Sequence, residues 1–147
     1  LWKSSASPRS IMSKSVTDCD AEDPLIRCTK RSFLVNIPFN SINWPAIEKT
    51  EYKGEHGTSY WRTVQLGGLR IRVVEYSAGY LADHWCEKGH VVHCLEGEFE
   101  SEFRNTDTVT LTKGMSYVVS DHMSMHRSSS KDGATLLIVD GSFLAGG

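Results

Sequence analysis

The stretch that decides the fold is GYLADHWCEKGHVVHCLEG, residues 79–97. It places His84, Cys86 and His90 close together between two glycines. In a β-strand, residues two apart share a face, so the side chains of His84 and Cys86 are expected on the same side. Residues 87–89 predict a tight reversal, after which His90 opens a second strand that runs back beside the first. Imidazole and thiol groups would then share one wall, and these groups are ligands for zinc and other late first-row metals.

Short alternating segments surround this stretch on both sides. Residues 59–66, 69–80 and 134–140 each predict a strand, and residues 105–107 predict the turn of a hairpin. No amphipathic helix longer than one turn is predicted. Roughly eight short strands with frequent turn signals are typical of an all-β fold, an antiparallel sandwich or barrel. In the strand before the hairpin, the inward side chains are expected to be Phe99, Ser101 and Phe103, with Glu98, Glu100 and Glu102 facing solvent.

The amino-acid composition argues against two classes of binding partner. The net charge of −2 gives no bulk electrostatic reason to bind nucleic acid or an anionic membrane. The longest aliphatic run, residues 136–139, is far shorter than the roughly 20 residues of a membrane helix. We therefore expect no nucleic acid and no membrane as partners, and a small-molecule ligand instead.

The first 34 residues differ from the rest. Residues 1–34 are polar and lack any strand or helix period, so they predict a disordered extension before one domain at 35–147. Cys86 and Cys94 are expected too far apart for a disulfide, which favours a reducing, cytoplasmic location. The Ser-rich, acid-poor start also fits a transit peptide, so an organelle stays open as the alternative.

The glycine and histidine spacing is similar to the first motif of the cupin superfamily. That motif has Gly, His-x-His, Glu and Gly, and the corresponding residues here are Gly79, His84, Cys86, His90 and Gly97. Cysteine stands where the second histidine would be, and histidine stands where the glutamate would be. The gap after the first glycine is one residue shorter than usual. The resemblance implies a single-domain cupin, a small antiparallel β-barrel or jelly roll.

The second cupin motif is matched more loosely. Gly114 fits, Ser120 replaces a proline, and His126 lies one residue beyond its expected place. Within the cupins, residues 83–86 (Asp-His-Trp-Cys) and 126–128 (His-Arg-Ser) resemble the small DHCW-motif proteins. That subfamily implies a site but no particular reaction. A homodimer is also implied by the cupin resemblance alone.

The resemblance and the spacing together predict one metal site. Its ligands are expected to be His84, Cys86, His90 and His126, while His93 has the opposite strand parity and is expected on the outer face. Sulfur and neutral imidazoles favour one divalent ion, Zn²⁺ first, with iron, nickel, manganese or copper as alternatives.

The function stays open between two classes at this point. A metal-binding cupin with an open coordination position would act on a small polar or anionic molecule in the barrel, whereas four protein ligands would make a non-catalytic metal or small-ligand binder, or a redox sensor. Arg70 and Arg72 would clamp an anion if their face is the interior, and would otherwise be solvent-exposed cations. Tyr76 and Tyr117 would line the pocket or plug it. These four residues, Arg70, Arg72, Tyr76 and Tyr117, are the predicted substrate-binding set.

Overall fold

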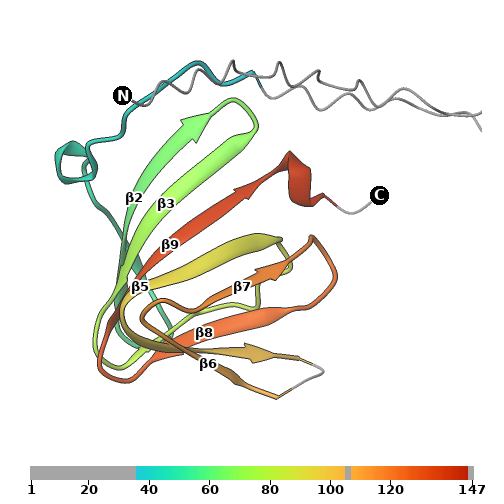
Figure 1. The fold of residues 1–147 in the computed structure, drawn as a ribbon. Coiled ribbons are helices and arrows are strands. Elements are labelled where there is room, and N and C mark those ends of the chain that lie inside the picture. The colour runs from blue at the N-terminus through green and yellow to red at the C-terminus, as the bar shows by residue number, and fades with distance from the viewer. Residues whose placement is uncertain (1–35, 105–106, 146–147) are drawn as a thin grey trace, which may run out of the picture. The chain divides into compact units, whose positions relative to one another are not determined.

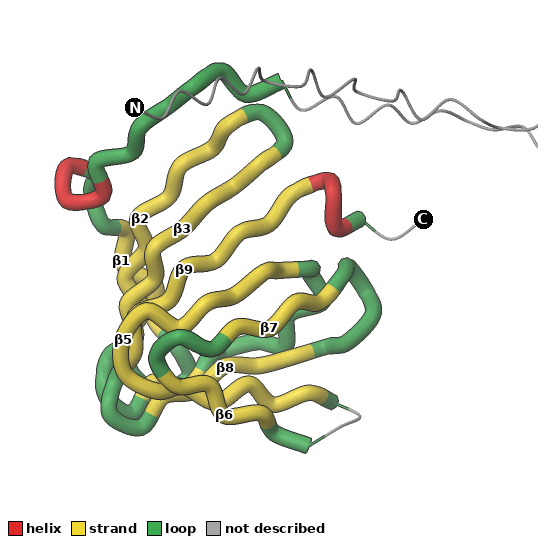
Figure 2. The backbone as a smooth tube through the Cα atoms, in the orientation of Figure 1, coloured by secondary structure: helices red, strands yellow, loops and turns green. Residues whose placement is uncertain are grey.

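The structure is a computed structural model that describes residues 36–104 and 107–145. Within those residues the chain forms nine strands, all paired antiparallel, and two short 3-10 turns (Figure 1, Figure 2). The all-β fold predicted from the sequence is confirmed. None of the helical segments in this part of the chain has the length and apolar character to cross a membrane. The predicted extension, residues 1–34, lies outside the described residues. The elements are η1 (Trp44–Ala46), β1 (Thr50–Lys53), β2 (Thr58–Leu66), β3 (Leu69–Tyr76), β4 (Tyr80–Leu81), β5 (His90–Phe103), β6 (Val109–Thr112), β7 (Ser116–Val119), β8 (His126–Ser130), β9 (Ala134–Gly141) and η2 (Ser142–Leu144).

The long strand β5 belongs to two sheets. Its first part pairs with β9 on one side and β7 on the other, and it continues the sheet β1-β2-β3-β9. Its second part pairs with β6 and β8, and β8 in turn pairs with β4. Because one strand runs through both sheets, the sheet curls round into a half-barrel (Figure 1).

The bend in β5 has a local cause. The pairing with β9 shifts register between Cys94 and Glu96, which marks a β-bulge. Gly97 follows with φ of 75°, in the left-handed region that favours glycine. A Cβ at Gly97 would lie 2.4 Å from the carbonyl oxygen of Gly133, so a larger residue would force the two strands apart.

The core lies along the inner face of β3, β5 and β9. Burial alternates strictly along β9, as expected for a strand with one face inward. Phe99 and Ser101 are buried while Glu98, Glu100 and Glu102 are exposed, and Phe103 is half-buried, which confirms the predicted parity of this segment. The core cluster consists of Val74, Val92, Cys94, Phe99, Leu111, Ala134, Leu136 and Ile138.

The hairpin predicted across residues 87–89 is wrong. Tyr80 and Leu81 form β4, which pairs with β8, and residues 82–89 form a loop. Cys86 makes an isolated bridge to His126, and His90 begins β5 beside β7 and not beside the preceding segment. The partner of the first half of this stretch lies about 40 residues further along the chain, a tertiary pairing that local alternation does not encode.

Candidate metal site and pocket

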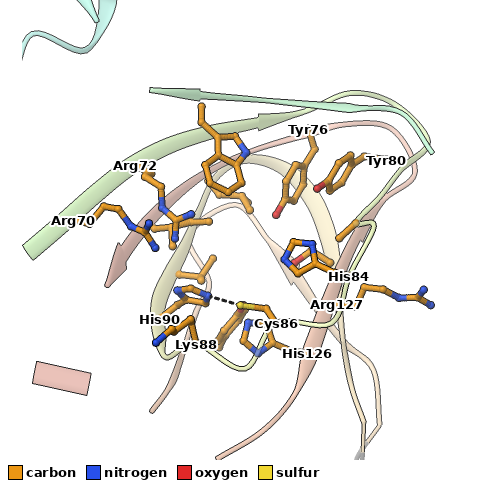
Figure 3. A pocket seen from close by; sticks show the side chains of 17 residues that line it. Arg70, Arg72, Tyr76, Tyr80, His84, Cys86, Lys88, His90, His126 and Arg127 are labelled. Atoms are coloured by element: carbon orange, nitrogen blue, oxygen red, sulfur yellow. Dashed lines mark hydrogen bonds between the residues drawn. The ribbon is translucent and has the colours of Figure 1, made fainter. Parts of the chain in front are cut away.

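Three predicted ligands converge at one point. One ligand atom from each of Cys86, His90 and His126 lies within 4.8 Å of the other two. The Cys86 sulfur is 3.3 Å from Nε2 of His90, and the two imidazole rings meet edge-on at a centroid distance of 5.3 Å (Figure 3). Each residue comes from a different element, since Cys86 lies in the loop, His90 opens β5 and His126 opens β8.

Backbone contacts hold the loop in place against both sheets. Cys86 and His126 exchange two main-chain hydrogen bonds, of 2.8 and 3.0 Å. The Gly89 N–H donates to Oδ1 of Asp121 at 2.5 Å, and a Cβ at Gly89 would collide with the backbone of residues 119–121. Main-chain pairing therefore fixes the backbone of Cys86, and its short side chain reaches the histidines from there.

The donor set suits a late divalent metal. Such an ion binds sulfur at about 2.3 Å and imidazole nitrogen at about 2.0–2.1 Å, so donors this close together can share one ion after small side-chain rotations. Burial would raise the pKa of Cys86, but the His90 imidazole, the Lys88 backbone N–H and Arg72 together lower it, which favours the thiolate that a metal needs. Burial lowers the pKa of His126, which favours its neutral, ligating form.

The structure does not bring the fourth predicted ligand into this cluster. The side chain of His84 is 70% exposed, and its Nδ1 lies 2.6 Å from Oδ1 of Asp83. His84 nevertheless lines the same pocket, so its role as a ligand stays a prediction. His93 lies outside the cluster, with its Nδ1 2.7 Å from the hydroxyl of Ser116 on β7.

A buried carboxylate that the sequence reading missed organises the other side of the cluster. Asp140 on β9 binds Arg72 through Oδ2 and accepts a hydrogen bond from Nε of Arg70 at 2.8 Å through Oδ1. Its Oδ2 also lies 3.4 Å from Nδ1 of His90, a charge contact without hydrogen-bond alignment. Asp140 shares the inward parity of Leu136 and Ile138, and that parity was the available signal for it.

The charges of this network reinforce one another. Burial would raise the pKa of Asp140, but His90, Arg70 and Arg72 hold it well below its ordinary value. Burial would lower the pKa of His90, but the Asp140 carboxylate and the Cys86 sulfur outweigh burial and raise it. Burial lowers the pKa of Arg72, yet a guanidinium stays charged at neutral pH.

A cavity of about 250 Å³ opens onto the cluster (Figure 3). It is smaller than the roughly 300–1,000 Å³ of pockets for drug-sized ligands. All four predicted substrate-binding residues line it, so the face of β3 that carries the arginines is the interior. Burial raises the pKa of Tyr117 to about 12 and raises that of Tyr76 as well, so both phenols stay protonated and can donate hydrogen bonds. The apolar part of the wall consists of Trp61, Val92, Leu136 and Ile138.

No protein-family model matches the sequence, and no curated protein is detectably similar to it. Solved structures do match the fold. An RmlC-like cupin from Shewanella frigidimarina NCIMB 400 is 18% identical, with a TM-score of 0.58 over 71% of this chain and 92% of that chain. The chain has the cupin fold.

Two further structural neighbours bear the names of enzymes. Ectoine synthase from P. lautus is 23% identical, with a TM-score of 0.55 over 69% of this chain and 76% of that chain. A sugar phosphate isomerase of the cupin superfamily from Silicibacter pomeroyi is 15% identical, with a TM-score of 0.55 over 68% of this chain and 74% of that chain. At these sequence identities the similarity shows a shared fold only. The function has to be inferred from the residues of the site.

Proposed function

We propose that this protein is a metal-dependent cupin that acts on a small polar or anionic molecule in its pocket. The observation that carries the proposal is the convergence of one sulfur and two imidazoles, from Cys86, His90 and His126, on the wall of a cavity that also holds a buried arginine. Three protein ligands beside a cavity are the arrangement of catalytic sites, in which the remaining position is left to water or substrate.

The residues of the proposed active site would have separate roles in binding the metal and the substrate. Cys86, His90 and His126 would hold one divalent ion, Zn²⁺ first among the alternatives because of the sulfur and the imidazoles. Such an ion would supply Lewis-acid chemistry or an activated water. The Asp140 carboxylate lies 3.4 Å from Nδ1 of His90, the ring nitrogen that does not face Cys86, and a small ring rotation would let it orient this histidine as outer carboxylates do. Arg72 and the Tyr76 and Tyr117 hydroxyls line the space in which a substrate would be held.

Motif and fold similarity support this proposal from a second direction. Residues 83–86 read Asp-His-Trp-Cys, which contains the four residue types of the DHCW motif with the last two in reversed order, and we propose membership of that subfamily on this ground. The named neighbours are, by their printed names, a synthase and a sugar phosphate isomerase, so the same half-barrel holds small-molecule enzymes elsewhere.

A second candidate is a closed metal site in a binding or redox-sensing protein. The position of His84 favours it, because this imidazole lines the same pocket as the half-buried Cys86 and belongs to the same loop. If the loop brought His84 onto the ion, four protein ligands would complete a structural site.

Cobalt(II) substitution distinguishes the two. Thiolate ligation gives a near-ultraviolet charge-transfer band, and the visible bands report the coordination number. We expect the band in the wild type, unchanged visible bands in His84→Ala, and a spectral shift when a small anion such as azide is added. Changed bands in His84→Ala together with no response to azide would favour the closed site. His93→Ala is the matched control, since His93 contacts Ser116 away from the cluster.

A further inference from the structure

The charges at one end of the pocket do not balance. Two guanidinium groups, those of Arg70 and Arg72, share the single carboxylate of Asp140. Figure 3 shows the two arginines beside each other at one end of the pocket. No carboxylate is among the described side chains that line the cavity. The two other cations of the lining have acids of their own at the rim, since Lys88 lies 3.9 Å from Asp121 and Arg127 lies 3.1 Å from Glu102. One positive charge therefore remains at the Arg70–Arg72 end.

The Arg72 half of this pair is poorly screened by water, whereas Arg70 is 39% exposed. The Arg72 side chain is only 5% exposed, its guanidinium stacks on the Trp61 ring at 4.7 Å, and its Nε has no hydrogen-bond partner. A buried charge without a full complement of partners is costly, so proteins normally pair it. A second anion at this end of the pocket would supply the missing partner.

We infer that the pocket binds a small carboxylate monoanion, with its carboxylate at the Arg70–Arg72 pair and its body against Trp61, Val92 and Leu136. This inference rests on the proposed function in that the same pocket is the active site. Because Arg72 and His90 both contact Oδ2 of Asp140, a carboxylate bound at the arginines lies next to the metal-binding cluster. The atoms adjoining the carboxylate would then face Cys86 and His126.

Three features favour a carboxylate over a phosphate. A planar guanidinium matches the two oxygens of a carboxylate in a forked geometry. The surplus at the arginine pair itself is one charge, which balances a monoanion there, whereas a phosphate monoester carries about −1.5 to −2 at pH 7. The further positive charge of a divalent ion bound with the Cys86 thiolate would belong to the metal site. Phosphate sites typically add backbone N–H groups from a helix N-terminus or a glycine-rich turn, whereas strand and loop side chains line this end of the pocket.

Isothermal titration calorimetry on the full chain with its metal tests the inference. The probes are acetate, butanoate and 2-hydroxybutanoate, each paired with its neutral amide, together with inorganic phosphate. We expect at least one carboxylate to bind roughly tenfold or more tightly than its amide and more tightly than phosphate. The decisive variant is Arg70→Met, because Arg70 is 39% exposed and its loss removes the surplus charge while keeping the buried Arg72–Asp140 pair.

In Arg70→Met the preference for carboxylate over amide should fall to about threefold or less. Arg62→Met is the matched control, since Arg62 forms an ion pair with Glu75 and does not line the pocket, and it should keep the preference. Equal binding of amide and carboxylate, tighter binding of phosphate, or no binding of any carboxylate would each overturn the inference. Metal content is measured in the same samples. Bound metal without a carboxylate preference rejects this inference alone, and a carboxylate preference without metal supports it while rejecting the metal-dependent function.

Discussion

Asp140→Asn is expected to destabilise the folded protein by removing a buried negative charge. It keeps the size of the side chain but removes the charge that two arginines and His90 share. The Asn amide oxygen can still accept one hydrogen bond, so the packing survives. What is lost is the electrostatic compensation of the buried Arg72.

The expected size of the effect follows from burial. Removing one partner of a buried ion pair costs on the order of 3–5 kcal/mol. Because Arg70 reaches solvent and Asn still accepts a hydrogen bond, we expect about 2–3 kcal/mol here. For a domain of this size that corresponds to a fall in Tm of roughly 10 °C.

Glu75→Gln provides the matched comparison. Its carboxylate also binds two cations, Lys49 at 2.6 Å and Arg62 at 2.7 Å, but it is 33% exposed. Solvent screening predicts a loss of less than about 1 kcal/mol. The assay is urea unfolding of the metal-free proteins at pH 7, followed by circular dichroism. Equal losses in the two variants, or a loss below 0.5 kcal/mol in Asp140→Asn, would refute the role assigned to the buried network.

The same variant has a defined pH dependence. The pKa of Asp140 is lower in the folded protein than in the unfolded chain, so its contribution is fully present above the unfolded pKa of about 3.9. That contribution is lost as the pH falls through the folded pKa. The difference in stability between wild type and Asp140→Asn should therefore be constant from about pH 5 to 6 and shrink below about pH 4. It should also shrink as the pH rises above about 6.5, because His90 then loses the proton that its contact with Asp140 favours. A difference that grows as the pH falls below about 5 would contradict this assignment.

Three further predictions concern the fold. Phe99→Ala removes an aromatic ring from the core and should lower the free energy of unfolding by about 3–5 kcal/mol, as measured by urea unfolding. A loss below about 1 kcal/mol would show that Phe99 is not a core residue. Gly97→Ala places a Cβ against the Gly133 carbonyl oxygen and should lower the Tm measured by calorimetry by several degrees. An unchanged Tm would contradict the close approach of the backbone at Gly97 and Gly133. Deleting residues 1–34 should leave a cooperatively folded domain, because the core cluster runs from Val74 to Ile138; a truncated chain that unfolds without a cooperative transition would show that the core is incomplete.

Local patterns predicted the strands well because each buries one face. The alternation of Phe99 and Ser101 with the glutamates, and the run that became β9, both appear as expected. The predicted hairpin at 87–89 failed for the opposite reason. Asp83, Glu87 and Lys88 are exposed, so no buried face fixed the pairing of this segment, and the distant strand β8 paired with it.

The sequence predicted the metal ligands of the site better than the charged residues around them. Spacing predicted that Cys86 and His90 would meet, although through a loop and not through a hairpin. Alternation on β3 could not say which face is inside, because Ile71 and Val73 are apolar yet face away from the pocket, while Arg72 faces into it. When polar side chains line an internal pocket, they face inward on a strand whose apolar side chains face outward. On β9 the alternation gave no guide to the inward face, because Leu137 and Val139 on the other face are as apolar as Leu136 and Ile138, and Asp140 was missed.

Metal content measured by inductively coupled plasma mass spectrometry tests the central claim most directly. The samples are wild type, Cys86→Ala and His93→Ala, each measured as purified and after reconstitution followed by desalting. We predict about one divalent ion per chain in the wild type and in His93→Ala, and a large loss in Cys86→Ala. A wild type that holds no metal after reconstitution, or a Cys86→Ala variant that keeps its full complement, would contradict the assignment of this cluster as a metal site.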